Sequence, residues 1–406
     1  MVSFDSELCV KCRGRGWCNQ PCKIYSLIKN SLPKPKTHFA GNSPPEIFVG
    51  RFNYPNIQAG ILSPEEFEDT EVYAMPELWH EKNLSIPEIL ANRGKLIYGR
   101  FQTQIKQITA KNKFKDLMQE ISMAHKPVST EFFLRKPPRQ AIEIERQYPI
   151  IGNPAPLEFA RLQENPKINP KVDYLVSDSD SKAVNSINEL YKDKIPVSNI
   201  IKILSAGLLG LKKQRKLVPT RWSITATDDT ISKELLKKIR YYPEINEILL
   251  FHSDYIGNHI EILMLPEKFA FEVVEISMIG SVWQPNQLSV MSDYEYFNGR
   301  KTYATNVVGA YYTDRLTICE YLEKIKKQAT IFFMHEEQPE YNAPLGVGII
   351  RETARQALTN PPEKFNTIQE ALNQAKQRFQ TPIQVFTNKS IILKTYKIQT
   401  RLNKWF

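Results

Sequence analysis

Four of the five cysteines in this 406-residue sequence lie close together near its start, at a spacing suited to binding a metal ion. Cys9, Cys12, Cys18 and Cys22 form the pattern C-x2-C-x5-C-x3-C, and two glycines between the pairs permit the tight reversal that would bring four thiolates together. Four thiolates close a tetrahedral structural site, so zinc is the expected ion. Compact four-cysteine runs also bind iron-sulfur clusters, and that alternative stays open.

A second group of residues, in the centre and the second half of the chain, combines carboxylates with basic side chains. A metal-dependent nuclease needs two or three carboxylates beside a phosphate and a cation to stabilise the transition state. The residues that could supply these groups are Asp228, Asp229, Glu272, Glu275, Asp293 and Glu295, with Arg221, Arg300 and Lys301. Asp228 and Asp229 are more simply the caps of a helix, and Glu272 and Glu275 should point to opposite faces of a strand. No phosphate loop, dinucleotide fingerprint or nucleophile elbow is found.

The last eight residues of the sequence carry a pattern typical of a partner-binding peptide. Gln399, Leu402, Trp405 and Phe406 fall at spacings of three, three and one. One turn of tight helix would gather the three apolar side chains on a single face and leave the glutamine to form hydrogen bonds. The pattern resembles the interaction motif by which proteins bind the DNA polymerase sliding clamp (PCNA), where an aromatic pair fills a hydrophobic pocket. The alternative is a last helical turn that docks on the protein's own core.

The balance of charge favours a polyanionic partner. Fifty-four basic and forty-four acidic side chains give a formal net charge of +10. The densest basic run comprises Lys212, Lys213, Arg215 and Lys216. Together with Arg221, Arg300 and Lys301, these residues are the candidate DNA contacts. A solvated helix end explains the run equally well, because basic side chains are favoured at helix C-termini.

The patterning of apolar residues indicates an α+β fold with a mixed, largely antiparallel sheet. Residues 248–252 and 259–265 alternate like the strands of a hairpin, and residues 271–276 would add a third strand. His252 and His259 flank this hairpin and could face each other across it, although no third ligand at metal spacing accompanies them. Residues 222–226 alternate like a strand that ends before a helix beginning near Asp228. Cys319 lies on the apolar face of an expected helix and is interpreted as a core thiol.

Composition excludes several classes of protein. The hydrophobic content of 42% and charged content of 24% are typical of a globular protein, and no apolar run approaches the roughly 18 residues that a membrane span needs. Acidic residues and cysteines occupy the place where a signal peptide would have its apolar centre. A cytoplasmic, nucleoid-associated protein with no membrane partner is therefore expected.

Several runs along the whole chain resemble the archaeal Nre family of DNA repair proteins. The clearest are residues 215–226, together with 41–45 and 49–51, and further matches are Glu272 and Glu275 in the expected strand 271–276 and residues 299–304, 309–312, 315–316, 344–348 and 351–352. The resemblance implies an N-terminal cysteine cluster, a two-part body and a C-terminal motif that binds the sliding clamp. It divides the chain into a metal knuckle and linker (1–40), two parts of the body (41–150 and 151–385) and a tail (386–406).

The resemblance implies a role in DNA damage repair and brings no catalytic mechanism with it. The function expected from the sequence is therefore that of a repair factor that binds the sliding clamp and contacts DNA. The alternative is a metal-dependent repair nuclease, or another DNA-processing enzyme, built on the central carboxylates.

Overall fold

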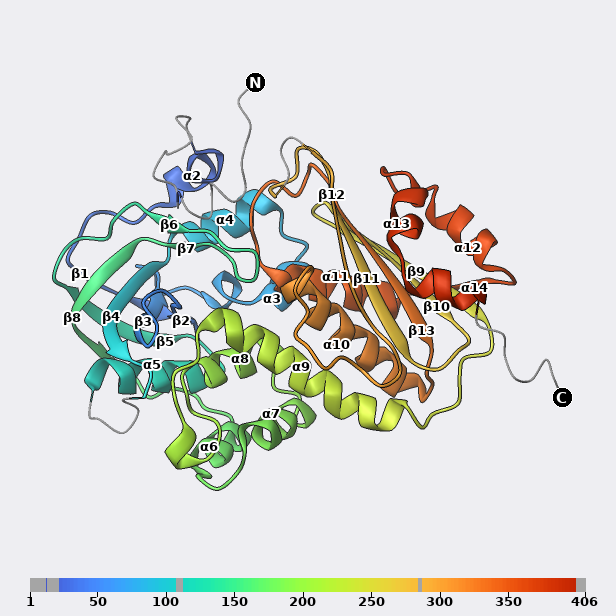
Figure 1. Cartoon of the computed structure of the whole chain (residues 1–406). Helices are drawn as coiled ribbons and strands as arrows, with labels where there is room; N and C mark the ends of the chain where they lie inside the picture. The colour runs from blue at the N-terminus through green and yellow to red at the C-terminus, as the bar shows by residue number, and fades with distance from the viewer. Residues whose placement is uncertain (1–11, 13–21, 107–111, 284–286, 399–406) are drawn as a thin grey trace. The chain divides into compact units, whose positions relative to one another are not determined.

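A computed structural model describes residue 12 and residues 22–106, 112–283 and 287–398. Cys9, Cys18 and all four residues of the expected clamp motif lie outside these ranges. The fold is α+β, as the sequence predicts, and its described residues form two compact units (Figure 1). The N-terminal unit extends to Ile231 and includes Pro344–Gly348, whereas the C-terminal unit comprises Ser232–Ala343 and the residues from Ile349 onward.

The N-terminal unit is built on a six-stranded sheet with the order β1-β5-β8-β4-β3-β2. Its strands are β1 (His38–Ser43), β2 (Ile47–Val49), β3 (Asn56–Ser63), β4 (Ile97–Gln104), β5 (Val128–Leu134) and β8 (Pro154–Leu162). Only the β4–β8 pair is parallel, so the sheet is mixed. Because β8 pairs with both β4 and β5, segments from the two sides of residue 150 share one sheet. A short ribbon of β6 (Ile142–Glu143) and β7 (Ile151–Gly152) precedes β8.

Short helices surround this sheet. They are α2 (Lys23–Ile28), α3 (Pro76–Glu81), α4 (Ile86–Gly94), α5 (Lys113–Met123), α6 (Pro170–Ser177), α7 (Ala183–Lys192) and α8 (Val197–Ser205), with 3-10 turns η1 (Lys29–Ser31), η2 (Glu71–Tyr73) and η3 (Lys212–Gln214). Helix α4 starts at a capping box, in which Ser85 and Glu88 satisfy each other's backbone donors.

Residues 222–226 are helical, so the strand expected there is wrong. Helix α9 (Thr220–Ile239) begins directly after Pro219 and runs through both aspartates, which therefore do not open a helix. The buried residues of its first turns recur at helical spacing, but most of them are polar. Ser223, Thr227 and Asp228 are as buried as Ile224. A stripe of polar residues gives no hydrophobic periodicity, and the chance alternation of apolar residues suggested a strand instead.

The C-terminal unit contains a second six-stranded sheet, with the order β12-β11-β13-β10-β9-β14. Its strands are β9 (Ile248–Tyr255), β10 (Asn258–Leu265), β11 (Ala270–Ser277), β12 (Ser289–Glu295), β13 (Thr330–Glu337) and β14 (Glu363–Phe365). The three central strands β10, β11 and β13 are buried along their whole length. Helices cover both faces of the sheet, which explains why every residue of these strands is buried.

The hairpin expected from the sequence is confirmed, and its turn fixes the register. Ile256 and Gly257 both have positive φ, and Tyr255 pairs with Asn258 across the two-residue turn. A Cβ on Gly257 would lie 2.5 Å from the backbone nitrogen of Tyr341, so only glycine fits. In this register His252 lies opposite Glu261, and His259 lies opposite Asp254. The two histidines therefore do not face each other.

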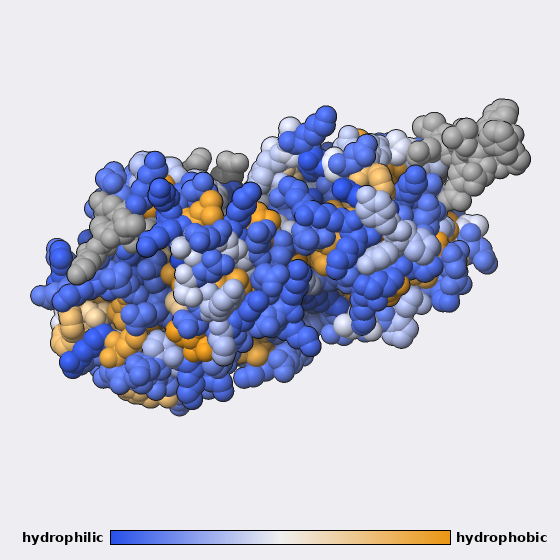
Figure 2. All heavy atoms as spheres, turned by 90° about the horizontal axis from the view of Figure 1, so that it is seen from below, coloured by the Kyte–Doolittle hydropathy of each residue, from blue (hydrophilic) through white to orange (hydrophobic). Residues whose placement is uncertain are grey.

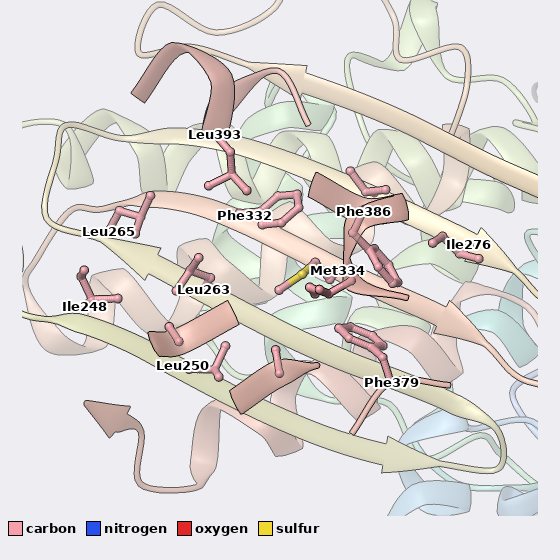
Figure 3. Close-up of a cluster of buried hydrophobic side chains, with 14 residues drawn as sticks. Ile248, Leu250, Leu263, Leu265, Ile276, Phe332, Met334, Phe379, Phe386 and Leu393 are labelled. Atoms are coloured by element: carbon pink, nitrogen blue, oxygen red, sulfur yellow. The ribbon is translucent and has the colours of Figure 1, made fainter. Parts of the chain in front are cut away.

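Helices α10 (Val308–Ile325) and α11 (Val347–Thr359) cover one face of this sheet, and α12 (Ile368–Ala375), α13 (Ile383–Lys389) and α14 (Ile392–Ile398) cover the other (Figure 1). Cys319 on α10 is fully buried, which confirms it as a core thiol, and burial raises its pKa. On the opposite face, side chains of the sheet meet Phe379, Phe386 and Leu393 in a single apolar cluster (Figure 3). Each fully buried side chain of this size contributes about 1.5–3 kcal/mol.

The surface seen in Figure 2 is dominated by hydrophilic residues, with apolar residues gathered in separate patches. Within the described ranges, no helix combines the length and the apolar character needed to cross a membrane.

A buried carboxylate organises the interior of the N-terminal unit. Glu46 accepts from Arg93 at 2.9 Å and from Lys202 at 3.0 Å, and these bonds link the β1–β2 connection to α4 and α8. Arg93 also donates to the carbonyl oxygens of Tyr73 and Ile150. Burial disfavours the charged form of Glu46, but the two cations outweigh it and lower its pKa.

We predict that Glu46→Gln destabilises the N-terminal unit by about 3–5 kcal/mol, because it leaves two buried cations without their carboxylate. Urea unfolding at pH 7 measures the loss. Because the pKa of Glu46 is lowered in the folded state, its contribution is present above the ordinary value of 4.5 and is lost as the pH falls below it. Glu65→Gln, which removes an exposed partner of Lys36, should change stability little. Equal stability of the two variants would contradict this assignment.

Candidate functional site

The segment that leads into the expected clamp motif is the first candidate site. Helix α14 ends at Ile398, and Gln399 is the next residue. Gln399, Leu402, Trp405 and Phe406 themselves lie outside the described residues. What the structure describes is how the preceding segment, residues 366–398, is held on the sheet.

Glu272 holds the start of α14. Its carboxylate, which projects from β11, accepts hydrogen bonds from the Ser390 hydroxyl (2.5 Å) and from the backbone N–H groups of Ile391 (2.8 Å) and Ile392 (3.0 Å). Burial raises the pKa of Glu272, and these three donors oppose that effect. A carboxylate at a helix N-terminus also interacts favourably with the helix dipole. Glu272 is thus a cap supplied by the sheet.

Two further carboxylates hold the segment before α13. Glu336 on β13 accepts from the backbone N–H groups of Gln380 (3.1 Å) and Thr381 (2.7 Å). Glu261 on β10 forms a bidentate pair with Arg378, whose Nε and terminal nitrogen lie 2.5 and 2.9 Å from its two oxygens. Bidentate guanidinium–carboxylate pairs are among the strongest polar contacts in proteins. All three acids of the sheet are fully buried, and we call them, with their partners, the carboxylate clasp.

His259 contributes a second cation to this clasp. Its Nε2 lies 3.2 Å from Glu261 and its Nδ1 lies 3.5 Å from Asp254, while the ring packs edge-on against Phe379. Burial by itself lowers the pKa of His259, but the hydrogen bonds to the two carboxylates outweigh it and raise the pKa to about 9. His259 is therefore a cation at neutral pH and helps to neutralise Glu261.

The carboxylates considered for a nuclease site do not converge. Glu272 and Glu275 face opposite sides of β11, as the sequence predicts: Glu272 contacts Ser390, and Glu275 lies 3.6 Å from His335. Asp293 accepts from the backbone N–H groups of residues 306 and 307, and Glu295 is paired with buried Arg315. Among the described residues, no group of three histidine, cysteine or acidic side chains could hold a metal ion.

The candidate arginines are engaged within the chain. Arg215 donates to three backbone carbonyls, those of Gly210, Val176 and Asp178, and so closes the loop around η3. Arg300 binds Asp293 and the backbone carbonyl of Tyr294 on β12, and it also donates to two carbonyls of its own loop. Arg221 pairs with Glu145 at 3.0 Å and keeps about a quarter of its side chain exposed. These bonds show that the three arginines organise local structure.

The candidate lysines differ from the arginines in their exposure. Lys212, Lys213, Lys216 and Lys301 are all exposed. Three of them lie in or beside η3, in the N-terminal unit, and Lys301 lies in the loop after β12, in the C-terminal unit. Exposed lysines can contact phosphate without breaking internal bonds.

Two of the four expected metal ligands belong to the described residues. Cys12 is buried, and Cys22 caps α2 by accepting a hydrogen bond from the backbone N–H of Tyr25 at 3.4 Å. An N–H donor at a helix N-terminus favours the thiolate form that a metal requires. The surroundings of the Cys22 sulfur are therefore compatible with a role as a metal ligand. Cys9 and Cys18 lie outside the described residues.

The carboxylate clasp itself was missed by sequence reasoning. Glu261 and Glu336 were not singled out, and Glu272 was considered only as a metal ligand. One signal could have found them: each is an acid in a strand that is buried along its whole length. Such an acid must find donors, because an unpaired buried carboxylate is strongly destabilising.

Comparisons with known proteins identify two family models along the chain. Residues 16–284 match the family model of the archaeal Nre N-terminal domain, and residues 295–405 match that of the archaeal Nre C-terminal domain. No solved structure matches the chain significantly.

Curated relatives match over most of their length. The chain is 32% identical to the DNA repair protein NreB of Archaeoglobus fulgidus, over 97% of this chain and 98% of that protein. It is 36% identical to the DNA repair protein NreA of the same organism, over 92% and 94%. NreA of Haloferax volcanii is 32% identical, over 78% and 77%.

The two family models, which match successive parts of this α+β chain, define the class of protein. The chain belongs to the archaeal Nre family, as the resemblance of its sequence predicts.

The clasp should make the C-terminal unit less stable at alkaline pH. The pKa of His259 is raised from 6.5 to about 9, so its contribution is complete below pH 6.5 and is lost as the pH rises through 9. The loss is on the order of 2–3 kcal/mol. We expect His259→Gln to remove this dependence, measured as the difference in unfolding free energy between wild type and variant from pH 6 to 10.

His252→Gln is the matched control for this prediction. His252 lies on the neighbouring strand, is half-exposed and is 3.9 Å from Glu363. Its replacement should leave the wild-type pH profile intact. If His259→Gln also keeps that profile, His259 does not carry the charge assigned to it.

Proposed function

We propose that this protein is a DNA repair factor that binds the sliding clamp through Gln399, Leu402, Trp405 and Phe406 and contacts DNA with its basic surface. The observation that carries the proposal is the position of the motif in the sequence. It follows directly on α14, whose first residue donates a hydrogen bond to the buried carboxylate of Glu272. The names of the relatives, all DNA repair proteins, supply the process.

The clasp suits a tail that binds a large partner. Because Glu272 caps α14 and Leu393 is buried in the apolar cluster, the described chain is fixed to within a few residues of the motif. A short connection between a binding peptide and a folded unit gives a high effective concentration of that unit near the partner. A repair factor held in this way would stay close to DNA encircled by the clamp.

The same proposal gives the exposed lysines the role of phosphate contacts. Lys212, Lys213, Lys216 and Lys301 are exposed, and the formal net charge of +10 favours a polyanion. Arg215 and Arg300 act by fixing their loops. Four of the acids considered for a nuclease, Glu272, Glu275, Asp293 and Glu295, act as caps or lie beside basic side chains within the chain, and the proposal includes no catalytic step.

A metal-binding knuckle completes the proposal. Cys9, Cys12, Cys18 and Cys22 would hold one zinc ion, with an iron-sulfur cluster as the alternative. The hydrogen bond from Tyr25 to the Cys22 sulfur supports a thiolate at that position.

The clamp motif can be tested by replacing both aromatic residues. We expect Trp405→Ala with Phe406→Ala to weaken binding to the purified sliding clamp at least about 100-fold, because buried aromatic anchors dominate such interfaces. Isothermal titration calorimetry measures the affinity. Lys404→Ala, which changes a neighbouring residue outside the motif, should bind within a few-fold of wild type. Undiminished binding by the double variant, with an unchanged circular dichroism spectrum, would refute the assignment.

The metal can be tested by replacing two ligands. Cys9→Ser with Cys12→Ser should remove the metal, because two thiolates cannot close the site. Elemental analysis of protein purified without oxygen should find one zinc per wild-type chain and none in the variant; iron with sulfide would establish the cluster instead. Cys319→Ser, in the core of the C-terminal unit, should keep its metal. A double variant that still holds one metal per chain would show that other residues bind it.

A further inference from the structure

Three large aromatic side chains of the N-terminal unit lie at the surface without a role in the function proposed so far. Phe52 and Tyr54 belong to the loop between β2 and β3, and Trp222 lies in the first turn of α9. They are 45%, 44% and 45% exposed. Leaving this much aromatic surface in water forgoes favourable burial, and grouped exposed aromatics commonly mark a binding surface.

The fold brings Tyr54 and Trp222 together from distant parts of the sequence. The rings of Tyr54 and Trp222 lie 5.3 Å apart, tilted by 56°. The backbone N–H of Val49 donates to the Thr220 hydroxyl at 3.0 Å, which joins the base of the loop to the start of α9. The juxtaposition is therefore built by a specific contact between the two segments.

The loop that carries Phe52 and Tyr54 is held at both ends. The N–H of Gly50 donates to the carbonyl of Gln58, and the N–H of Ile105 donates to that of Pro55. A third bond, from Asn56 to Asn53, closes the turn, in which Asn53 adopts a positive φ of 62°. Rings presented on a fixed loop lose little conformational entropy when a ligand stacks on them.

Positive charge accompanies the aromatic residues. Arg51 lies over the ring of Phe52, with its guanidinium carbon 4.9 Å from the ring centre. Both Arg51 and Arg221 pair with the same oxygen of Glu145, at 3.2 and 3.0 Å. Two guanidinium groups on one carboxylate leave a net charge of +1. The partly exposed arginines can therefore attract an anion while Glu145 positions them.

Exposed aromatic rings beside cationic groups are the chemistry that recognises unpaired nucleobases. Bases stack on aromatic side chains, and each such contact is sequence-tolerant because every base has a π face. Paired bases inside a duplex cannot reach the rings. We propose that Phe52, Tyr54 and Trp222, here called the aromatic platform, bind unpaired bases of single-stranded DNA, with Arg51 and Arg221 beside the phosphates.

This inference rests on the proposed contact with DNA and makes it specific for unpaired strands. The platform is distinct from the exposed lysines at residues 212–216, which would bind phosphates of either form of DNA. A protein that uses both should prefer DNA with single-stranded segments, such as gaps and frayed ends.

The first test compares affinities of the full-length protein for a fluorescent 20-nucleotide oligothymidylate and for a blunt duplex of equal length. We expect Tyr54→Ala with Trp222→Ala to weaken single-strand binding about 10-fold or more, at an unchanged salt slope, and to leave duplex binding within about twofold. Trp222→Phe should retain most of the affinity, because phenylalanine still stacks. Tyr174→Ala, which removes a more exposed aromatic of the same unit, should behave like wild type.

The second test needs no variant. Oligothymidylate carrying 5-bromouracil should cross-link to Tyr54 or Trp222 on ultraviolet irradiation, identified by mass spectrometry of the peptides. Cross-links confined to other regions would overturn the platform, as would unchanged single-strand affinity in the folded double variant. A preference for RNA of the same sequence would overturn the assignment to DNA.

The outcomes separate this inference from the proposed function. If wild type binds single-stranded DNA but the platform variant binds it equally well, the platform fails and the DNA contact stands. If wild type binds no form of DNA, both fail. Clamp binding, measured on the same variants, should not change in any case.

Discussion

A buried carboxylate must find donors, and this constraint organises the C-terminal unit. Glu261, Glu272 and Glu336 project from three neighbouring strands toward the face covered by α12–α14. Left unpaired, each would be strongly destabilising. Their donors come from residues 378–392, a segment far away in the sequence. The sheet and the end of the chain are thus mutually dependent: the acids require the segment, and the segment obtains its helix cap from the acids.

Within the N-terminal unit, two buried carboxylates, Glu46 and Glu145, differ in the burial of the cations that they hold. Glu46 is enclosed by Arg93 and Lys202, so its ion pairs fix elements within the interior. Glu145 holds Arg51 and Arg221 where both remain partly exposed, so its pairs keep these cations at the surface. The first kind of pair contributes to stability, and we propose that the second contributes to recognition of DNA. The same distinction separates Arg215, which is bound to backbone carbonyls, from the exposed lysines around it.

Much of the secondary structure could be predicted because local chemistry dictates it. The hairpin was found through its alternating apolar residues, and the Ser85–Glu88 capping box is a local pattern that marks the start of α4. Residues 222–226 were misread because the buried stripe of α9 is polar, with Ser223, Thr227 and Asp228 in it. The prediction that His252 and His259 could face each other was also wrong. The register of the hairpin depends on the length of its turn, which the sequence pattern left open.

By itself the sequence determined family, composition and the two terminal motifs, because these depend on residue types and on short spacings along the chain. It also placed Glu272 and Glu275 on opposite faces, which follows from the period of a strand. The tertiary structure decided which side chains meet. Only the sheet order brings Glu272 to α14, and only the contact between Val49 and Thr220 brings Tyr54 beside Trp222. Such partners are separated by more than a hundred residues, and no local pattern encodes a contact over that distance.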